Sequence, residues 1–132
     1  MKHSQYKILV VDDDVNVQEM LKQSLEDSGY SVSTEGSAIK ALNQIEKNNY
    51  DLLIIDIMMP DIDGIALCKS VRNLPGCEKI PIIILTALSD SETMHDVMLY
   101  GAVDYVVKPF DIVALKEKIK MALYQARKKK PI

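Results

Sequence analysis

Five short runs rich in apolar residues recur along the chain, and the stretches between them have a different periodicity. Most of the runs are continuously apolar, which is typical of strands buried on both faces of a parallel sheet. One run alternates polar and apolar residues and therefore suits a strand nearer the sheet edge. In chain order, the five expected strands span residues 7–11, 30–35 (the alternating run), 51–56, 81–86 and 103–107.

The stretches between these runs place apolar residues three and four positions apart, which is the spacing of one helix face. Regular alternation of strands and helices predicts a single α/β domain, doubly wound around a parallel sheet. We expect the flavodoxin-like (βα)5 arrangement, with the strands in the order 2-1-3-4-5. The expected helices include residues 17–25, 38–45, 67–71, 94–98 and 112–123.

Length and composition exclude several classes of protein. A chain of 132 residues suits one domain, which we place at residues 1–126, followed by a basic tail or truncated linker at 127–132. A net charge of −3 argues against nucleic-acid binding, and no apolar run approaches the ~20 residues that span a bilayer. The N-terminus lacks the long apolar segment of a signal peptide, and Cys68 and Cys77 suit reduced thiols, Cys68 on a buried helix face. We therefore expect a cytoplasmic protein without membrane contact.

Four of the expected strands end at or just before residues suited to phosphoryl chemistry. In open parallel sheets, ligands bind in the crevice outside the carboxyl ends of the strands. In the expected strand order, the ends of the first, third, fourth and fifth strands are neighbours, so their polar residues should meet. These residues are Asp12, Asp13 and Asp14 after the first strand, Asp56 at the end of the third, Thr86 at the end of the fourth and Lys108 after the fifth.

This set of side chains suggests a metal-assisted phosphoryl transfer. Asp12, Asp13 and Asp56 would repel one another, and a hard divalent cation relieves such repulsion. Mg²⁺ prefers a few carboxylates together with water and phosphate oxygens, so we expect Mg²⁺, or Mn²⁺ in its place. Asp56 is central and follows a buried run, which makes it the best candidate for a nucleophile that becomes an aspartyl-phosphate. Lys108 and the Thr86 hydroxyl would then contact other phosphoryl oxygens.

Four stretches of the sequence resemble the signature segments of a known family. They are KILVVDDD, DLLIIDIMMPDIDG, PIIILTA and GAVDYVVKPF, which are similar to the segments of response-regulator receiver domains in two-component signalling. The resemblance covers roughly residues 6 to 125. Within the family, the chain resembles the chemotaxis regulators. In combination these motifs are specific.

The resemblance assigns metal-site and acceptor roles to individual residues. Asp12 and Asp13 match the acidic pair of the family, with Asp13 as the direct metal ligand. Asp56 matches the phosphoacceptor, and the backbone carbonyl of Met58 would complete the metal site. These roles agree with the chemistry expected from the residue types alone.

The resemblance also assigns residues that contact the phosphoryl group or respond to it. Thr86 matches the switch hydroxyl, and Ala87 matches the small residue that leaves room for a phosphodonor. Lys108 matches the phosphate-pairing lysine, and its peptide bond to Pro109 would be cis as in the family. Tyr105 matches the aromatic switch, which turns inward as the threonine moves towards the phosphoryl group.

The implied function is a phosphorylation-driven switch. Asp56 would accept a phosphoryl group from a phosphohistidine on a histidine kinase or histidine-phosphotransfer protein. The surface formed by the fourth helix, the fifth strand and the fifth helix would then change, to control an output domain or target protein. The domain catalyses this transfer and its own dephosphorylation, but its role is signalling. Dephosphorylation should be slow, because Met58 and Leu88 are apolar and cannot orient an attacking water.

A calcium-binding loop is one competing interpretation of the acidic cluster. Asp12, Asp14 and Asn16 begin like such a loop, but Val17 and Gln23 stand where it needs Gly and Glu. The sequence therefore argues against calcium binding. Asp14 is instead expected to cap the helix that follows it.

Two further interpretations stay open at this stage. A haloacid-dehalogenase-like Mg²⁺ phosphatase also uses an aspartate, a Thr or Ser and a Lys on a parallel sheet. Its nucleophile follows the first strand in a DxDx(T/V) motif, whereas Asn16 occupies the last position here and Asp56 would have no role. A degenerate receiver would bind partners without being phosphorylated, although retention of all five key residue types argues against it.

The sequence gives limited information on whether the domain dimerises or controls DNA binding. In the DNA-binding subfamily with a winged helix, charged residues on the last two helices form a phosphorylation-dependent homodimer. Met94 and Leu99 occupy positions where a basic and an acidic member are expected, although Asp104 and Lys118 can still pair. Such a homodimer is therefore doubtful for this chain, and no DNA-binding element is present in the sequence.

Overall fold

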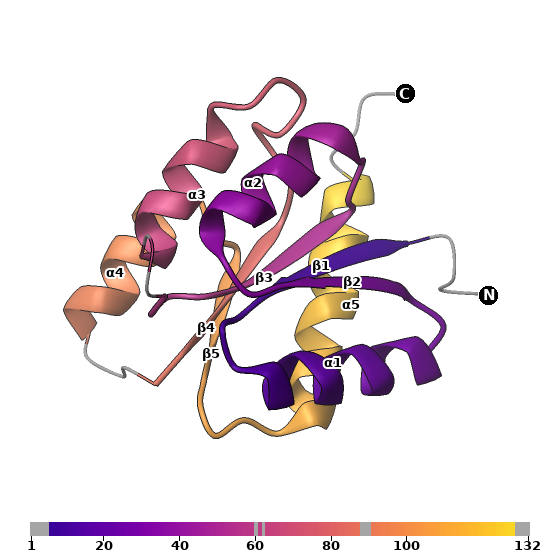
Figure 1. Ribbon diagram of the computed structural model, residues 1–132. Coiled ribbons are helices and arrows are strands. Elements are labelled where there is room, and N and C mark those ends of the chain that lie inside the picture. Colours follow the sequence, from indigo (N-terminus) through magenta and orange to yellow (C-terminus); the bar gives the residue numbers. More distant parts are fainter. Residues whose placement is uncertain (1–5, 60, 62, 88–90, 129–132) are drawn as a thin grey trace.

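A computed structural model describes residues 6–59, 61, 63–87 and 91–128 of the chain (Figure 1). Within these described residues, five strands alternate with five helices, as the apolar runs and helical spacing predict. The elements are β1 (Lys7–Val11), α1 (Val15–Asp27), β2 (Ser31–Glu35), α2 (Ala38–Lys47), β3 (Leu52–Asp56), α3 (Gly64–Arg72), β4 (Ile82–Thr86), α4 (Ser91–Leu99), β5 (Asp104–Val107) and α5 (Ile112–Lys128).

All the strand pairs in the sheet are parallel, and the strand order is β2-β1-β3-β4-β5. This is the doubly wound, flavodoxin-like arrangement expected from the sequence. The alternating run forms β2 at one edge of the sheet, as predicted. The register pairs Asp56 with Leu85 and Thr86 with Val107, so the carboxyl ends of β3, β4 and β5 lie close to one level.

Each buried strand divides its apolar side chains between two separate cores. Helices α1 and α5 cover one face of the sheet, and α2, α3 and α4 cover the other (Figure 1). Because successive strand residues point to opposite faces, a continuous apolar run serves both cores. In β1 and β3, Ile8, Val10, Leu52 and Ile54 face α1 and α5, whereas Leu9, Val11, Leu53 and Ile55 face the other helices.

Short polar side chains begin three of the helices. The Asp14 carboxylate accepts hydrogen bonds from the backbone N–H groups of Asn16 and Val17, which confirms that Asp14 caps α1. Ser37 caps α2, and Asp63 caps α3. Each cap provides partners for backbone donors that a helix cannot satisfy internally.

The two cysteines are free thiols, as expected from the sequence. Cys68 is buried on α3, and burial raises the pKa of its thiol to about 11. At the end of the chain, α5 continues to Lys128, so the proposed division at residue 126 falls within this helix. Among the described residues, no helix is both long and apolar enough to span a membrane.

The guanidinium of Arg72 joins the end of α3 to the two turns that precede β4 and β5. It donates hydrogen bonds to the carbonyl oxygens of Cys77 at 3.1 Å, Ile80 at 2.7 Å and Gly101 at 2.6 Å. Gly101 has φ +94°, and a Cβ built there would lie 2.6 Å from the Arg72 Nε atom. Glycine is therefore required at this turn by its backbone conformation and by the close approach of Arg72.

Replacing Arg72 by Met keeps a long side chain but removes every hydrogen-bond donor. Because three carbonyl oxygens lose a charged partner, we expect the free energy of unfolding to fall by about 2–4 kcal/mol in urea denaturation. The control Lys47→Ala removes an exposed cation from the last turn of α2 and should change the free energy by less than about 0.5 kcal/mol. Equal effects of the two substitutions would contradict the anchoring role of Arg72.

Candidate functional site

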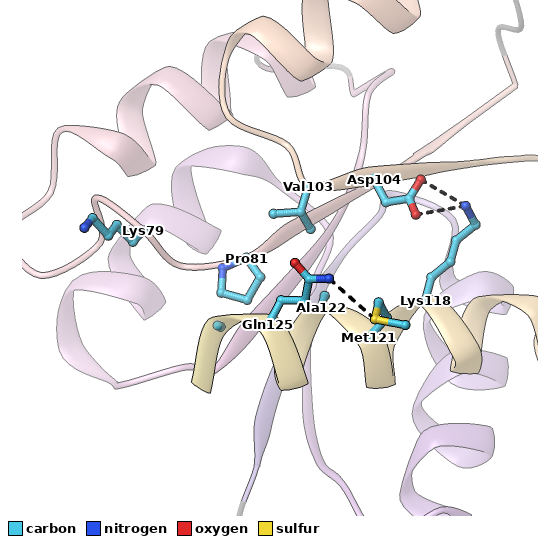
Figure 2. A pocket seen from close by; sticks show the side chains of 9 residues that line it. Lys79, Pro81, Val103, Asp104, Lys118, Met121, Ala122 and Gln125 are labelled. Atoms are coloured by element: carbon cyan, nitrogen blue, oxygen red, sulfur yellow. Dashed lines mark hydrogen bonds and ion pairs between the residues drawn. The ribbon is translucent and has the colours of Figure 1, made fainter. Parts of the chain in front are cut away.

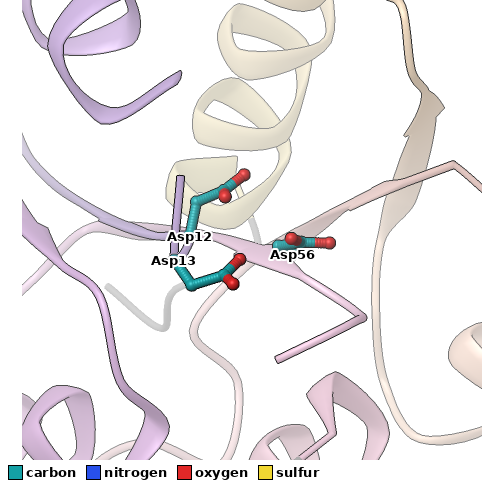
Figure 3. Close-up of side chains that lie close together, drawn as sticks. All are labelled: Asp12, Asp13 and Asp56. Atoms are coloured by element: carbon teal, nitrogen blue, oxygen red, sulfur yellow. The ribbon is translucent and has the colours of Figure 1, made fainter. Parts of the chain in front are cut away.

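Three aspartates meet at the carboxyl edge of the sheet. Asp12 and Asp13 follow β1, and Asp56 is the last residue of β3, the neighbouring strand. Figure 3 shows the three side chains beside one another at the two strand ends, and one oxygen of each lies within 4.8 Å of the others. Asp12 is fully buried and Asp56 is 6% exposed, whereas Asp13 is open to solvent. The expected acidic cluster is therefore present, with one exposed member.

Lys108 brings a positive charge to this cluster from the loop after β5. Its Nζ atom lies 2.8 Å from Asp12 Oδ2 and 3.4 Å from Asp56 Oδ2. Burial acts to lower the pKa of Lys108, but the hydrogen bond and charge of Asp12, together with Asp56, outweigh burial and raise it. The ammonium is therefore firmly charged. The peptide bond between Lys108 and Pro109 is cis, as expected.

The two buried carboxylates have different surroundings. Burial raises the pKa of Asp56, and the negative charge of Asp12 raises it further. The backbone N–H of Met58, at 3.1 Å from Asp56 Oδ1, and the Lys108 ammonium oppose this increase but do not cancel it. Asp12 uses both of its oxygens in hydrogen bonds, Oδ1 with the Asp14 N–H at 2.9 Å and Oδ2 with Lys108. Lys108 lies closer to Asp12 than to Asp56, so Asp12 is the more tightly held of the two carboxylates.

The segment after β3 turns sharply behind Asp56. The Gly64 N–H donates to the Ile57 carbonyl oxygen at 2.8 Å, which closes the loop onto the strand end. A Cβ built on Gly64 would lie 2.5 Å from the Ile57 Cα atom, so a side chain at this position would displace the loop. Met58 lies within the loop, and its side chain is 58% exposed.

The remaining expected site residues lie on the β4 and β5 side. Thr86 ends β4 and is fully buried, and its carbonyl oxygen accepts the Lys108 N–H at 2.7 Å. Ala87 follows it and is exposed. Tyr105 on β5 is half-buried against the α2, α3 and α4 side of the core. Leu88, expected to affect dephosphorylation, lies outside the described residues.

Two side chains near the cluster were not anticipated from the sequence. Gln18 on α1 donates from Nε2 to the Asp12 carbonyl oxygen at 2.6 Å. Asp61 in the loop after β3 accepts hydrogen bonds from the first backbone N–H groups of α2, those of Ala38 and Ile39. Neither residue lies at the end of a strand, the position that predicts the other site residues. An acidic residue three positions after Met58 carries no recognisable pattern by itself.

The fold and the acidic cluster with its lysine define a doubly wound α/β protein with a charged site at the carboxyl edge of its sheet. Residues 8–120 match the model of the response regulator receiver domain, so the chain belongs to that family. The expectation drawn from the four sequence segments is therefore confirmed. Receiver domains are the phosphorylation-dependent switches of two-component systems.

Two sequence relatives agree with this assignment. The response regulator ArlR of Staphylococcus haemolyticus is 40% identical over 88% of this chain, and the transcriptional regulatory protein ZraR of Escherichia coli is 37% identical over 93% of it. The match covers 52% of ArlR and 27% of ZraR, so this chain spans about half or less of these relatives.

Solved structures give the same result for the fold. A CheY-like receiver domain protein of Methanospirillum hungatei superposes with a TM-score of 0.89 at 32% identity, covering 95% of this chain and 98% of that one. The chemotaxis protein CheY4 of Vibrio cholerae superposes with a TM-score of 0.85 at 31% identity, covering 89% of this chain and 98% of that one.

Replacing Asp56 by Asn removes a carboxylate from the cluster and keeps its shape. Because the folded state raises the pKa of Asp56, ionising this group disfavours folding, and the penalty is fully present only at pH values above that raised pKa. In EDTA at neutral pH, we expect Asp56→Asn to raise the free energy of unfolding by on the order of 1 kcal/mol. The gain should disappear below about pH 4, where wild-type Asp56 is protonated in both states.

Thermal and urea denaturation at several pH values measure this effect. The control Asp51→Asn alters a carboxylate that accepts the Lys7 N–H, away from the acidic cluster, and should give no gain in stability. An Asp56→Asn variant less stable than wild type at neutral pH would show that Lys108 compensates the cluster completely.

Proposed function

We propose that Asp56 accepts a phosphoryl group and that Asp12, Asp13, Thr86 and Lys108 assist the transfer. The observation that carries this proposal is the ammonium of Lys108 placed against Asp12 and Asp56, beside a third carboxylate. The site therefore combines a nucleophile with a fixed positive charge for phosphoryl oxygens.

The residues present fit a bound Mg²⁺ or Mn²⁺ ion. Three carboxylate oxygens lie within 4.8 Å of one another, and hard oxygen donors of this number suit an ion that keeps several waters. Asp12, Asp13 and Asp56, with the Met58 backbone carbonyl, would hold the ion, and Asp13 is the exposed member through which it is reached. When bound, the ion would neutralise charge on the phosphoryl oxygens.

The transfer itself is a substitution at phosphorus. A carboxylate oxygen of Asp56 forms a new P–O bond as the P–N bond of the donor phosphohistidine breaks, and the imidazole leaves with the electron pair of that bond. Lys108 exchanges its contact with Asp56 for one with a phosphoryl oxygen. The Thr86 hydroxyl donates to another oxygen, and the small exposed Ala87 leaves room for the donor. The same site would catalyse hydrolysis of the acyl-phosphate.

The signal would leave the site through β4 and β5. Lys108 and Thr86 are already joined by a backbone hydrogen bond of 2.7 Å, so movement of either is transmitted to the other. In the proposed active state, Tyr105 turns inward as Thr86 moves. A small preference of the phosphoryl group for that state, a few kcal/mol, is sufficient for a switch.

The surface of α4, β5 and α5 is proposed to contact the output domain or target protein. A pocket of about 200 Å³ lies beside α5 and is lined by residues that include Val103, Met121 and Lys79 (Figure 2). Beside it, Lys118 Nζ lies 2.9 Å from the Asp104 carboxylate of the same chain. We propose a cytoplasmic location and, as donor, a histidine kinase or histidine-phosphotransfer protein.

The alternative phosphatase chemistry is not favoured by the surroundings of Asp12. Asp12 is fully buried and its Oδ2 atom lies 2.8 Å from Lys108 Nζ, whereas Asp56 is 6% exposed and its Oδ2 atom lies 3.4 Å from the same nitrogen. Asp56 is the better placed nucleophile for that reason.

The proposed domain division at residue 126 and a homodimer through the last two helices stay predictions.

Incubation with acetyl phosphate and Mg²⁺ should add one phosphoryl group to the wild-type protein, as measured by intact mass spectrometry. Asp56→Asn should abolish the addition because the nucleophile is lost, and Lys108→Met should slow it strongly because the phosphoryl charge loses its partner. The control Asp51→Asn should be labelled like wild type. Label on Asp56→Asn, or ester hydrolysis that requires Asp12 but not Asp56, would favour the phosphatase.

The phosphorylated protein should lose its phosphoryl group slowly, over minutes or longer at neutral pH. The exposed Met58 side chain cannot orient a water molecule, so Met58→Asn should accelerate dephosphorylation severalfold. Decay of the phosphorylated species by mass spectrometry measures the rate. Met20→Asn, which changes another exposed methionine on α1, is the matched control and should leave the rate unchanged. A half-life of seconds in the wild type would be incompatible with this account.

A further inference from the structure

The loop between β3 and α3 is anchored near both of its ends. At the start, the Met58 N–H donates to Asp56 Oδ1 at 3.1 Å, and at the end the Gly64 N–H donates to the Ile57 carbonyl oxygen at 2.8 Å. Residues 60 and 62 lie outside the described part of the chain. Between the two anchors, Asp61 makes contacts with a different element of the fold.

Asp61 completes the N-terminus of α2 from outside that helix. Its Oδ1 atom accepts the Ala38 N–H and its Oδ2 atom accepts the Ile39 N–H, each at 3.2 Å. The first N–H groups of a helix have no internal partner, and the local cap Ser37 accepts the Lys40 N–H and also forms a side-chain hydrogen bond with Asp61. A carboxylate is also favoured at this end of the helix dipole. Two of the first donors of α2 therefore depend on Asp61.

The segment that joins β2 to α2 also contacts the residues around Asp12. Glu35, at the end of β2, accepts the Asp12 N–H at 3.0 Å through its carbonyl oxygen. A Cβ built on the next residue, Gly36, would lie 3.2 Å from Gln18 Nε2, the group that holds the Asp12 carbonyl. Residues 35–39 thus contact the loop that carries Asp12 and, through Asp61, the loop that carries Met58.

We propose that Asp61 is a positioning residue for the metal site, which holds the Met58 loop against α2 and couples metal binding to the start of that helix. The inference rests on the proposed function, because Met58 and Asp56 would be metal ligands. Asp61 does not contact the ion; it limits the movement of the segment that contributes one of the ligands. The two interactions are reciprocal, so metal binding must stabilise the cap as much as the cap favours metal binding.

The first test compares Mg²⁺ affinity in Asp61→Asn and Asp51→Asn, with chemical shifts of backbone amides followed by NMR. Both substitutions replace an aspartate that accepts backbone N–H groups from another element, but the Asp51 carboxylate accepts the Lys7 N–H, away from the acidic cluster. We expect the dissociation constant of Mg²⁺ to rise about three- to tenfold in Asp61→Asn, at or below the usual effect of outer-shell residues. Asp51→Asn should bind like wild type.

The second test measures hydrogen exchange of the Ala38 and Ile39 amides with and without Mg²⁺. In the wild type, Mg²⁺ should slow the exchange of both amides by the same factor by which Asp61 strengthens Mg²⁺ binding. In Asp61→Asn, exchange should be faster and no longer respond to Mg²⁺. A purely local role as a helix cap predicts faster exchange but an unchanged dissociation constant.

The possible outcomes separate this inference from the proposed function. If the wild type binds Mg²⁺ and Asp61→Asn binds it equally well, the positioning role is wrong and the proposed function is unaffected. If the wild type fails to bind Mg²⁺ at all, both are wrong. Weaker binding in Asp61→Asn, together with loss of the Mg²⁺ effect on the two amides, supports the coupling.

Discussion

The repulsion between carboxylates at the edge of the sheet is the constraint on which the rest of the site depends. Asp12, Asp13 and Asp56 lie within contact range, and two of them are buried. Lys108 joins the buried pair from a loop 52 residues beyond Asp56 in the chain. Three carboxylates and one ammonium leave two negative charges, which a divalent cation balances. The excess negative charge of the cluster is therefore the physical reason for the proposed metal binding.

Parallel topology explains why this part of the site was predictable from the sequence. The sequence of a buried strand is a continuous apolar run, and the carboxyl ends of parallel strands meet at one edge of the sheet. A polar residue directly after such a run therefore has a known place without any knowledge of its side-chain rotamer. Asp12, Asp56 and Lys108 follow this rule, and the structure brings them together. Asp14 follows the equally local rule for helix caps.

The contacts that hold the loops were not predictable in this way. Gln18, Asp61 and Arg72 each bond backbone groups of a segment whose path is set by the packing of other elements. Their residue types are common on surfaces, and no fixed spacing links them to their partners. Asp61 meets the start of α2 only because β2 and β3 lie on either side of β1. Such contacts depend on the tertiary structure, and no sequence pattern predicts them.

The two sides of the sheet edge are held differently, and this bears on how a signal leaves the site. Towards β5, Lys108 and Thr86 are joined directly through the backbone, and the exposed apolar residues Leu99, Val103 and Val107 lie on the elements beyond them. Towards α2, the connection is the Asp61 carboxylate on two backbone amides. In the proposed mechanism, phosphorylation would draw Lys108 and Thr86 together, whereas metal binding would act on the Met58 loop. The geometry thus allows a bound metal to order the Met58 loop beside α2, and a phosphoryl group to move Lys108 and Thr86 on the β5 side.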